Sequence, residues 1–105
     1  MAQYAIHKNS NPNTRKLYPF LINVQSSLLD VLDTRMVIPL TAKETLGGKL
    51  IKTLNPVIDI EEQEYIIQTQ QMASIHVKNL GIQIGDASLK RNEILSSIDF
   101  MITGF

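Results

Sequence analysis

The sequence predicts a small, mostly β fold that carries one carboxy-terminal helix. Two observations support this prediction. Short segments of alternating apolar and polar residues recur along the chain, and only the segment from Ser88 to Phe105 has a long helical periodicity. The 105 residues are 44% hydrophobic and 19% charged, which is typical of one globular domain covering residues 1–105. We therefore expect a twisted barrel or sheet that packs against one helix.

The strands are predicted from a period of two in side-chain polarity. Pro39 cannot donate to a sheet ladder, so it indicates an edge or a bulge in its strand. The acidic segment 61–64 is expected to form the tip of a hairpin. Residues 9–16, rich in Asn and Pro, are expected to form a turn or a mobile loop. The expected strands cover residues 3–8, 18–24, 35–41, 56–60, 65–69 and 74–78.

Two helices are expected. Thr41 is followed three residues later by Glu44, which is the pattern of a capping box for a short helix over residues 41–46. The two glycines that follow would end this helix. The long final helix can be capped by Asp86 or Ser88, and it is expected to continue to the last residue of the chain.

One face of the final helix is apolar. The stripe is roughly 120° wide on a helical wheel at about 100° per residue, and its part over residues 94–98 is expected to pack in the core. Phe100 lies nearly opposite, so the last turn is apolar on two sides. An apolar end must be buried in the domain, a second copy or a partner. The stripe consists of Ile94, Leu95, Ile98, Met101, Ile102 and Phe105.

Composition excludes some function classes and argues against others. The chain has no cysteine, which excludes thiol and disulfide chemistry. Ten basic residues balance ten acidic ones, and a neutral chain without a basic stripe is a poor candidate for direct nucleic-acid binding. The first residues lack the pattern of a signal peptide, and no segment approaches the ~20 apolar residues of a membrane span. We expect a soluble cytoplasmic protein.

No catalytic or metal site can be assembled from the residues, so we expect neither an enzyme nor a cofactor. His7 and His76 are both expected on strand surfaces. Four carboxylates cluster near the predicted hairpin, but they lack the fixed spacing and the turn glycine of a calcium loop. They are expected to be solvated, and they are Asp59, Glu61, Glu62 and Glu64.

Three short segments, in this order, resemble one protein family. They are VQSSLLD at residues 24–30, RMVIPL at 35–40 and MASI at 72–75, and a helix that closes on TGF follows them. Each motif alone is weak, but the ordered set resembles the CcdB family, the toxins of a bacterial toxin–antitoxin pair. The resemblance covers essentially the whole chain, although the loop after Lys8 is a few residues longer than in the best-known member.

The resemblance implies a small SH3-like β-barrel with a three-stranded side sheet and a carboxy-terminal α-helix, assembled as a two-fold homodimer. It implies a toxin that binds the A subunit of DNA gyrase and traps the cleaved gyrase–DNA complex without catalysis. A cognate antitoxin would neutralise the toxin through a disordered tail that folds on binding. The two proteins together would repress their own operon, with the DNA contact made by the antitoxin.

The resemblance also implies where gyrase binds. Thr103 stands where the best-known member has a tryptophan, and threonine cannot stack on a cation or an aromatic face. Ile102 likewise replaces an aromatic residue. Met101 is expected at the dimer interface, and an apolar pair at residues 28 and 29 could alternatively plug the barrel. The implied gyrase contacts are Leu28, Leu29, Asp99, Ile102, Thr103, Gly104 and Phe105.

Two alternative functions remain open. Endoribonuclease toxins of the MazF and Kid type share this barrel, although a shared fold does not carry function. Such an enzyme needs an acid–base set, for which Arg15 with Thr14 is the one candidate. The second alternative is a homologue that dimerises and binds the antitoxin without toxicity, and Thr103 motivates it.

Overall fold

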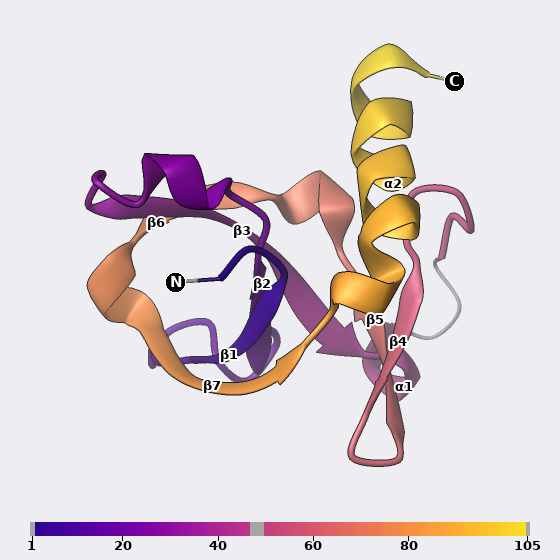
Figure 1. Ribbon diagram of the computed structural model, residues 1–105. Helices are drawn as coiled ribbons and strands as arrows, with labels where there is room; N and C mark the ends of the chain where they lie inside the picture. Colours follow the sequence, from indigo (N-terminus) through magenta and orange to yellow (C-terminus); the bar gives the residue numbers. More distant parts are fainter. Residues whose placement is uncertain (1, 47–49, 105) are drawn as a thin grey trace.

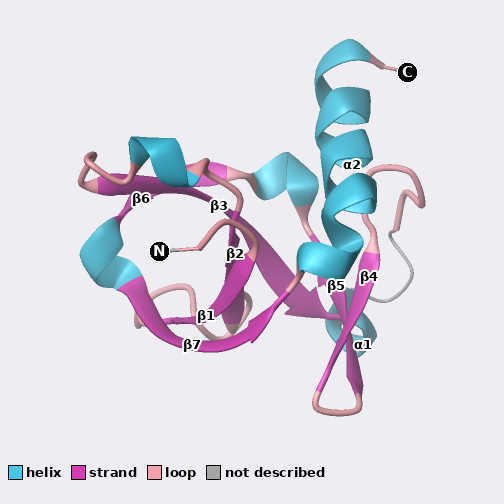
Figure 2. Cartoon of the chain, viewed as in Figure 1, coloured by secondary structure: helices cyan, strands magenta, loops and turns pink. Residues whose placement is uncertain are grey.

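The computed structural model describes residues 2–46 and 50–104, and it confirms a mostly β fold with one long carboxy-terminal helix (Figures 1 and 2). The strands are β1 (Ala5–Asn9), β2 (Phe20–Asn23), β3 (Thr34–Ala42), β4 (Val57–Ile60), β5 (Gln63–Ile67), β6 (Ala73–His76) and β7 (Leu80–Asp86). The α-helices are α1 (Lys43–Leu46) and α2 (Arg91–Thr103). The 3-10 turns are η1 (Ser27–Leu29), η2 (Thr69–Gln71), η3 (Val77–Asn79) and η4 (Ser88–Lys90).

The strands form one curled antiparallel sheet in the order β4-β5-β3-β2-β1-β7, and β6 pairs with β3 outside this path. The long strand β3 has two partners along one edge, because residues 34–37 pair with β6 and residues 40–42 pair with β5. Pro39 lies between these two ladders, where no bond from its nitrogen is needed. This proline therefore marks a change of partner inside a central strand, and the predicted edge position is wrong.

The main core lies on one face of the curled sheet. Ile6, Ile22 and Ile38 are register neighbours across β1, β2 and β3, and all three are buried. Ile94 of α2 belongs to the same cluster. A buried isoleucine side chain contributes roughly 1.5–3 kcal/mol, so this cluster holds the helix to the sheet. A second, smaller cluster is formed by Leu21, Val37 and Leu80.

Strand β7 has no counterpart among the predicted strands. Its glycines weaken the alternating pattern by which a strand is predicted. Gly81 is required by packing, since a Cβ there would lie 2.7 Å from the carbonyl oxygen of Lys8. The close approach joins β7 to β1, which makes β7 the last strand of the sheet path.

The predicted helix caps are corrected by the structure. Thr41 does not cap α1: it lies in β3 opposite Ile66, and its hydroxyl is buried without a hydrogen-bond partner among the described residues. The predicted stop at residues 47 and 48 lies outside the described residues. Asp86 Oδ1 accepts a 2.7 Å hydrogen bond from the Ser88 N–H at the start of η4. The N-cap residues of η4 and α2 are Ala87 and Lys90, and neither makes a side-chain cap, so the predicted cap of the final helix by Asp86 or Ser88 is wrong. Hydrogen bonds from the side chain and from the backbone of Ser88 lower the pKa of the Asp86 carboxyl.

Helix α2 ends at Thr103, before the last residue. Gly104 adopts a left-handed conformation with φ of 78°, and its N–H donates to the Phe100 carbonyl at 2.8 Å. This conformation suits glycine and ends the helix. No helix among the described residues is long and apolar enough to cross a membrane.

Candidate functional site

The predicted contact residues lie in two separate places. Residues 28 and 29 belong to η1, which lies beside β3 and β6 in Figure 1. The other contacts lie at the end of α2, which packs against η2 and η4 and rises beyond the sheet (Figure 1). One chain therefore does not join these residues into one continuous surface.

The segment after β2 exposes several apolar side chains, named here the apolar loop. Leu28 is 91% exposed and Val31 is 88% exposed, while Leu29 and Leu32 are each about half exposed. The alternative in which the pair at residues 28 and 29 plugs the barrel is therefore wrong. An exposed apolar cluster of this kind is typical of a protein-binding surface. The apolar loop consists of Leu28, Leu29, Val31 and Leu32.

Sequence reasoning missed half of the apolar loop. The resemblance pointed only to residues 28 and 29, whereas Val31 and Leu32 extend the same exposed segment. The sequence does contain a signal for this surface. The run LLDVLD at residues 28–33 combines four large apolar residues with two acidic ones and lacks the alternating pattern of a strand. An apolar run without strand or helix periodicity, in a segment between strands, is a reasonable marker of an interaction surface.

Arg35 supports the apolar loop through hydrogen bonds to its backbone. Its side chain is buried, and Nη1 donates to the carbonyl oxygens of Leu32 at 2.6 Å and Thr34 at 2.8 Å. Nη2 donates to the Asp30 carbonyl at 3.2 Å, and Nε lies 3.6 Å from Asp30 Oδ1. Hydrogen bonds from a charged donor are stronger than neutral ones. The guanidinium thus holds the backbone of the loop at three positions.

Gln25 and Ser26 add a second set of bonds. Gln25 Nε2 donates to the Thr34 carbonyl at 3.1 Å, and Gln25 Oε1 accepts from the Met36 N–H at 2.9 Å. Ser26 Oγ accepts from the Leu28 N–H at 3.2 Å. A loop fixed in this way loses little conformational freedom when a partner binds. The apolar loop is therefore a preorganised protrusion.

Helix α2 is held to the body through its first half. Within Arg91–Thr103 the buried residues are Ile94 and Ser97. Ser97 Oγ donates to the Ile94 carbonyl at 2.7 Å and lies 2.9 Å from the hydroxyl of Thr69 on η2. Leu95 is exposed, so the prediction of core packing for residues 94–98 is wrong at that position, while Ile98 packs partly against the core.

The helix end, residues 101–104, leaves the predicted contacts accessible. Ile102 is 71% exposed, Thr103 and Gly104 are exposed, and Met101 is partly buried. Thr103 Oγ1 donates to the Asp99 carbonyl at 2.7 Å, so its hydroxyl hydrogen is used within the helix. A Cβ on Gly104 would meet no atom within 4 Å. Phe105, the last predicted contact, lies outside the described residues.

Phe100, on the opposite side of α2, has neighbours in its own chain. It is partly buried and lines a groove of about 430 Å³ with Lys52 and Pro56, which lie on the segment before β4. The two apolar sides of the last turns therefore differ, because Phe100 contacts its own chain and Ile102 is exposed to solvent. Among the described residues of these turns, Ile102 is the most exposed large apolar side chain.

The histidines and carboxylates do not form a reactive centre. His7 is buried, with Nδ1 3.0 Å from the Gly81 carbonyl oxygen, so the prediction of a strand surface is wrong for this residue. His76 is exposed as predicted, and its Nδ1 accepts from the Lys78 N–H. The described residues contain no group of three or more His, Cys, Asp or Glu side chains that could hold a metal ion.

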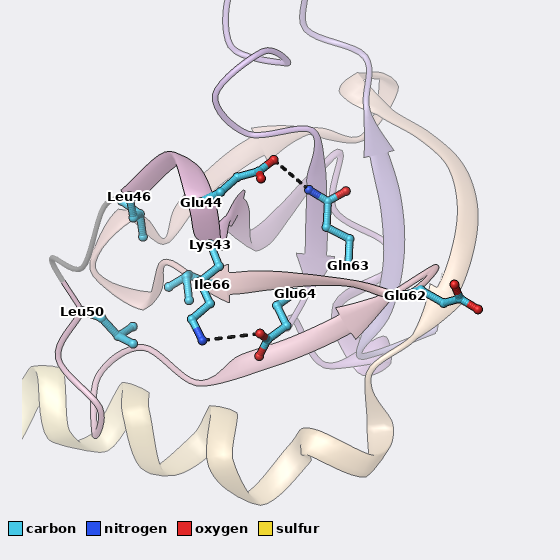
Figure 3. Close-up of a pocket in the computed structure, with 8 residues that line it drawn as sticks. All are labelled: Lys43, Glu44, Leu46, Leu50, Glu62, Gln63, Glu64 and Ile66. Carbon is cyan, nitrogen blue, oxygen red and sulfur yellow. Dashed lines mark hydrogen bonds and ion pairs between the residues drawn. The ribbon is translucent and has the colours of Figure 1, made fainter.

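A groove of about 560 Å³ lies between α1 and β5 (Figure 3). Lys43 Nζ lies 3.4 Å from Glu64 Oε1, and Gln63 Nε2 donates to Glu44 Oε1 at 3.3 Å. Figure 3 shows the Glu62 side chain pointing away from these pairs. None of the described residues that line the groove is a histidine. Its polar groups pair with one another, which suits binding better than acid–base chemistry.

The acid–base candidate in the first loop is not assembled either. Thr14 and Arg15 are exposed, and Thr14 Oγ1 accepts a 3.0 Å hydrogen bond from Asn9 Nδ2. A general base must lie within hydrogen-bond reach of the proton that it removes, and Arg15 is a permanent cation that cannot take this role. The structure therefore offers no support for an endoribonuclease site at these residues.

A comparison with protein-family models extends the argument beyond single motifs. The model described as CcdB protein matches residues 3–104 of this chain. The match starts before β1 and ends at the C-cap of α2, so it includes the apolar loop and the helix end. The resemblance suggested by three short motifs is therefore confirmed across nearly the whole fold.

Proposed function

The chain belongs to the CcdB family, the gyrase-poison toxins of type II toxin–antitoxin pairs, and from this membership we propose that it binds the A subunit of DNA gyrase and traps the cleaved gyrase–DNA complex. The family acts without catalysis, so no bond is made or broken by the toxin itself. The observation that most supports the proposal is the exposed apolar loop held on a buried arginine. The action takes place in the cytoplasm, where gyrase lies.

The apolar loop and the helix end supply the proposed contact surface. Burial of an exposed leucine or valine side chain contributes roughly 1.5–3 kcal/mol, and the loop offers four such side chains. Val31 and Leu32 enlarge the apolar area beyond the predicted pair, which offsets the loss of an aromatic side chain at Thr103. The proposed gyrase contacts are Leu28, Leu29, Val31, Leu32, Asp99, Ile102, Thr103, Gly104 and Phe105.

A homodimer is the second part of the proposal. Met101 is partly buried and faces the same side of α2 as the stripe residues, which supports a place at the interface between two protomers. A two-fold dimer presents each surface twice, so gyrase, itself built of paired subunits around the cleaved DNA, meets a symmetric ligand.

Neutralisation and operon control complete the proposal. A cognate antitoxin binds the toxin through a disordered tail that folds on binding. The complex of the two represses their operon, and the antitoxin makes the DNA contact. This division of labour is supported by the charge of the toxin, since ten basic residues balance ten acidic ones and leave no excess for phosphate binding.

Binding to purified gyrase A subunit tests the proposal. The full chain is expected to form a complex at micromolar concentration and to stabilise cleaved DNA with whole gyrase. Ile102→Ser should weaken the complex by about tenfold, because the complex would bury the aliphatic group that this change removes. Ile82→Ser is the matched control, because Ile82 is 69% exposed against 71% for Ile102 but lies on β7.

Removal of residues 102–105 gives the sharper variant. The truncated chain should keep its thermal midpoint, because the residues removed are exposed where described, and it should no longer inhibit bacterial growth. A truncated chain that still kills would contradict the proposed contact surface. A full chain that forms no complex with the gyrase A subunit would contradict the proposed target.

One observation favours a second candidate function, a homologue that dimerises and binds antitoxin without poisoning gyrase. The Thr103 hydroxyl donates to the Asp99 carbonyl, so it has no hydrogen left to donate to a partner. The same gyrase-binding measurement separates the two functions. Antitoxin binding with no gyrase complex would favour the second candidate.

A further inference from the structure

The curled sheet has an open seam between its two end strands. β4 and β7 end the strand path and do not pair with each other among the described residues. Both strands nevertheless line one groove of about 360 Å³. β4 contributes Ile58, Asp59 and Ile60 to this groove, and β7 contributes Ile84, Gly85 and Asp86. The groove floor is the main core, because Ile6 and Ala87 also line it.

The hairpin determines which backbone groups of β4 are free. Glu61 and Glu62 have φ of 51° and 66°, which is typical of a two-residue type I′ turn closed by hydrogen bonds between the flanking residues. The Ile67 N–H donates to the Pro56 carbonyl at 2.8 Å. This pair lies an even number of positions from Ile60 and Gln63 along the ladder, so it belongs to the same set of hydrogen-bonded pairs. Bonded and non-bonded pairs alternate along an antiparallel ladder. The residues between bonded pairs, Val57 and Asp59, therefore direct their N–H and C=O groups away from β5.

The charge around the seam is acidic. The charged residues that line the groove are Asp59, Glu61, Asp86 and Lys90. Lys90 is the one cation among them, and its Nζ lies 3.5 Å from Glu93 Oε1. Asp86 is bound to the Ser88 N–H, whereas Asp59 and Glu61 accept no hydrogen bond from the described residues. A basic partner is therefore favoured over an acidic one.

We propose that the free edge of β4 is a docking site for an extended segment of a partner protein, in which apolar and basic residues alternate. The main chain of this segment pairs with Val57 and Asp59 as an added strand. The pattern follows from β4 itself, because cross-strand neighbours share a face. Side chains beside Ile58 and Ile60 meet the apolar floor, and side chains beside Asp59 meet the carboxylates.

The seam lies away from the proposed gyrase contacts. Figure 1 places the tip of the β4–β5 hairpin at the opposite end of the molecule from the carboxy terminus of α2. A segment bound at β4 therefore leaves the helix end accessible. The inference does not rest on gyrase binding, and its test contains no gyrase.

The experiment titrates the ¹⁵N-labelled full chain with a short peptide of alternating lysine and valine. A peptide of alternating glutamate and valine is the charge-reversed control. The lysine peptide should shift the amide resonances of Val57 and Asp59 and slow hydrogen exchange at Asp59, while the amides of α2 beyond Ser97 stay unchanged. The glutamate peptide should bind at least about tenfold more weakly, because two uncompensated carboxylates face it.

Two substitutions at one position separate strand pairing from charge. Asp59→Pro removes an outward N–H that β5 does not use, and proline is tolerated on an edge strand; it should raise the dissociation constant of the lysine peptide by about tenfold. Asp59→Asn keeps the N–H and removes the charge, so it should cause a smaller, salt-dependent loss.

Several results would contradict a docking site at the free edge of β4. Absence of shifts at β4, equal binding of both peptides, or unchanged binding by folded Asp59→Pro would overturn it. Concentration-dependent self-association that Asp59→Pro abolishes would also overturn it, since the occupant would then be a second copy of the chain. If Asp59→Pro does not fold, hydrogen exchange at Asp59 in the unmodified chain decides between an added strand and a contact by side chains alone.

Discussion

The apolar loop and the helix end both expose apolar side chains, but they are supported in different ways. The loop is bonded to the body at several backbone positions, through Arg35 and Gln25. The helix end is joined to the body mainly through earlier residues of α2, among which Ile94 and Ser97 are buried and Ile98 packs partly against the core. The first surface is thus fixed locally, and the second is fixed by a remote contact in the same helix.

The residues that position each surface are therefore different from the residues that form it. In the loop, the positioning residue lies directly under the exposed side chains. In the helix, the positioning residues Ile94 and Ser97 lie about one to two turns before the exposed Ile102, and the helical hydrogen bonds carry their effect along the axis. Stability and partner binding should therefore separate differently in the two regions.

The largest effect is expected at the base of the helix. Ile94→Ala should lower the free energy of unfolding by about 4 kcal/mol, because the side chain is fully buried and a cavity remains. Ile102→Ala, near the other end of the same helix, should change it by less than about 0.5 kcal/mol. Urea denaturation measures both. Equal losses would mean that the helix end also packs against the body.

The next effect concerns the support of the loop. Arg35→Ala should cost about 3 kcal/mol, since three backbone carbonyl groups lose a charged donor whose side chain is buried. Arg15→Ala is the matched control, because Arg15 is exposed, and its change should stay within about 0.5 kcal/mol. Urea denaturation of both variants provides the comparison. An Arg35→Ala protein as stable as the control would contradict the positioning role.

A surface change in the loop should affect binding and leave stability intact. Val31→Ser should weaken the complex with the gyrase A subunit by about tenfold, with an unchanged unfolding midpoint, because the side chain is almost fully exposed. Calorimetric titration and thermal denaturation measure the two quantities. Unchanged affinity would remove Val31 from the proposed contact surface.

The smallest effect is expected where α2 is connected to β7. The hydrogen bonds to Ser88 lower the pKa of Asp86, so its carboxylate stabilises the fold above the unfolded pKa, and this contribution is lost as pH falls through the folded pKa. Because Asp86 is exposed, Asp86→Asn should cost below about 1 kcal/mol at pH 7.

The pH dependence of stability tests this contribution of the Asp86 carboxylate. The difference in free energy of unfolding between the parent chain and Asp86→Asn should shrink as the pH falls through the lowered folded pKa of the Asp86 carboxyl. Asp59→Asn is the control, because the Asp59 carboxylate accepts no hydrogen bond from the described residues. A constant difference across this pH range would contradict a role for the ionised form of Asp86.

The local patterns predicted much of the fold and part of the site. The hairpin over residues 57–67 and the apolar face of the last helix were readable because alternation and helical periodicity are properties of neighbouring residues. The burial of individual polar side chains was harder to predict from the sequence. His7 is polar and lies on the first strand, yet it is buried against the Gly81 carbonyl of a strand that no alternation revealed.

Local periodicity and ordered short motifs are enough to predict the fold class, the family and an apolar helix end. Three features could not be predicted in this way: Arg35 supports an exposed loop, Ser97 rather than Leu95 meets η2, and β4 and β7 flank an open seam. The physical reason is that these features depend on contacts between residues far apart in the chain. Local periodicity carries no information on which distant partner a side chain or a strand edge meets.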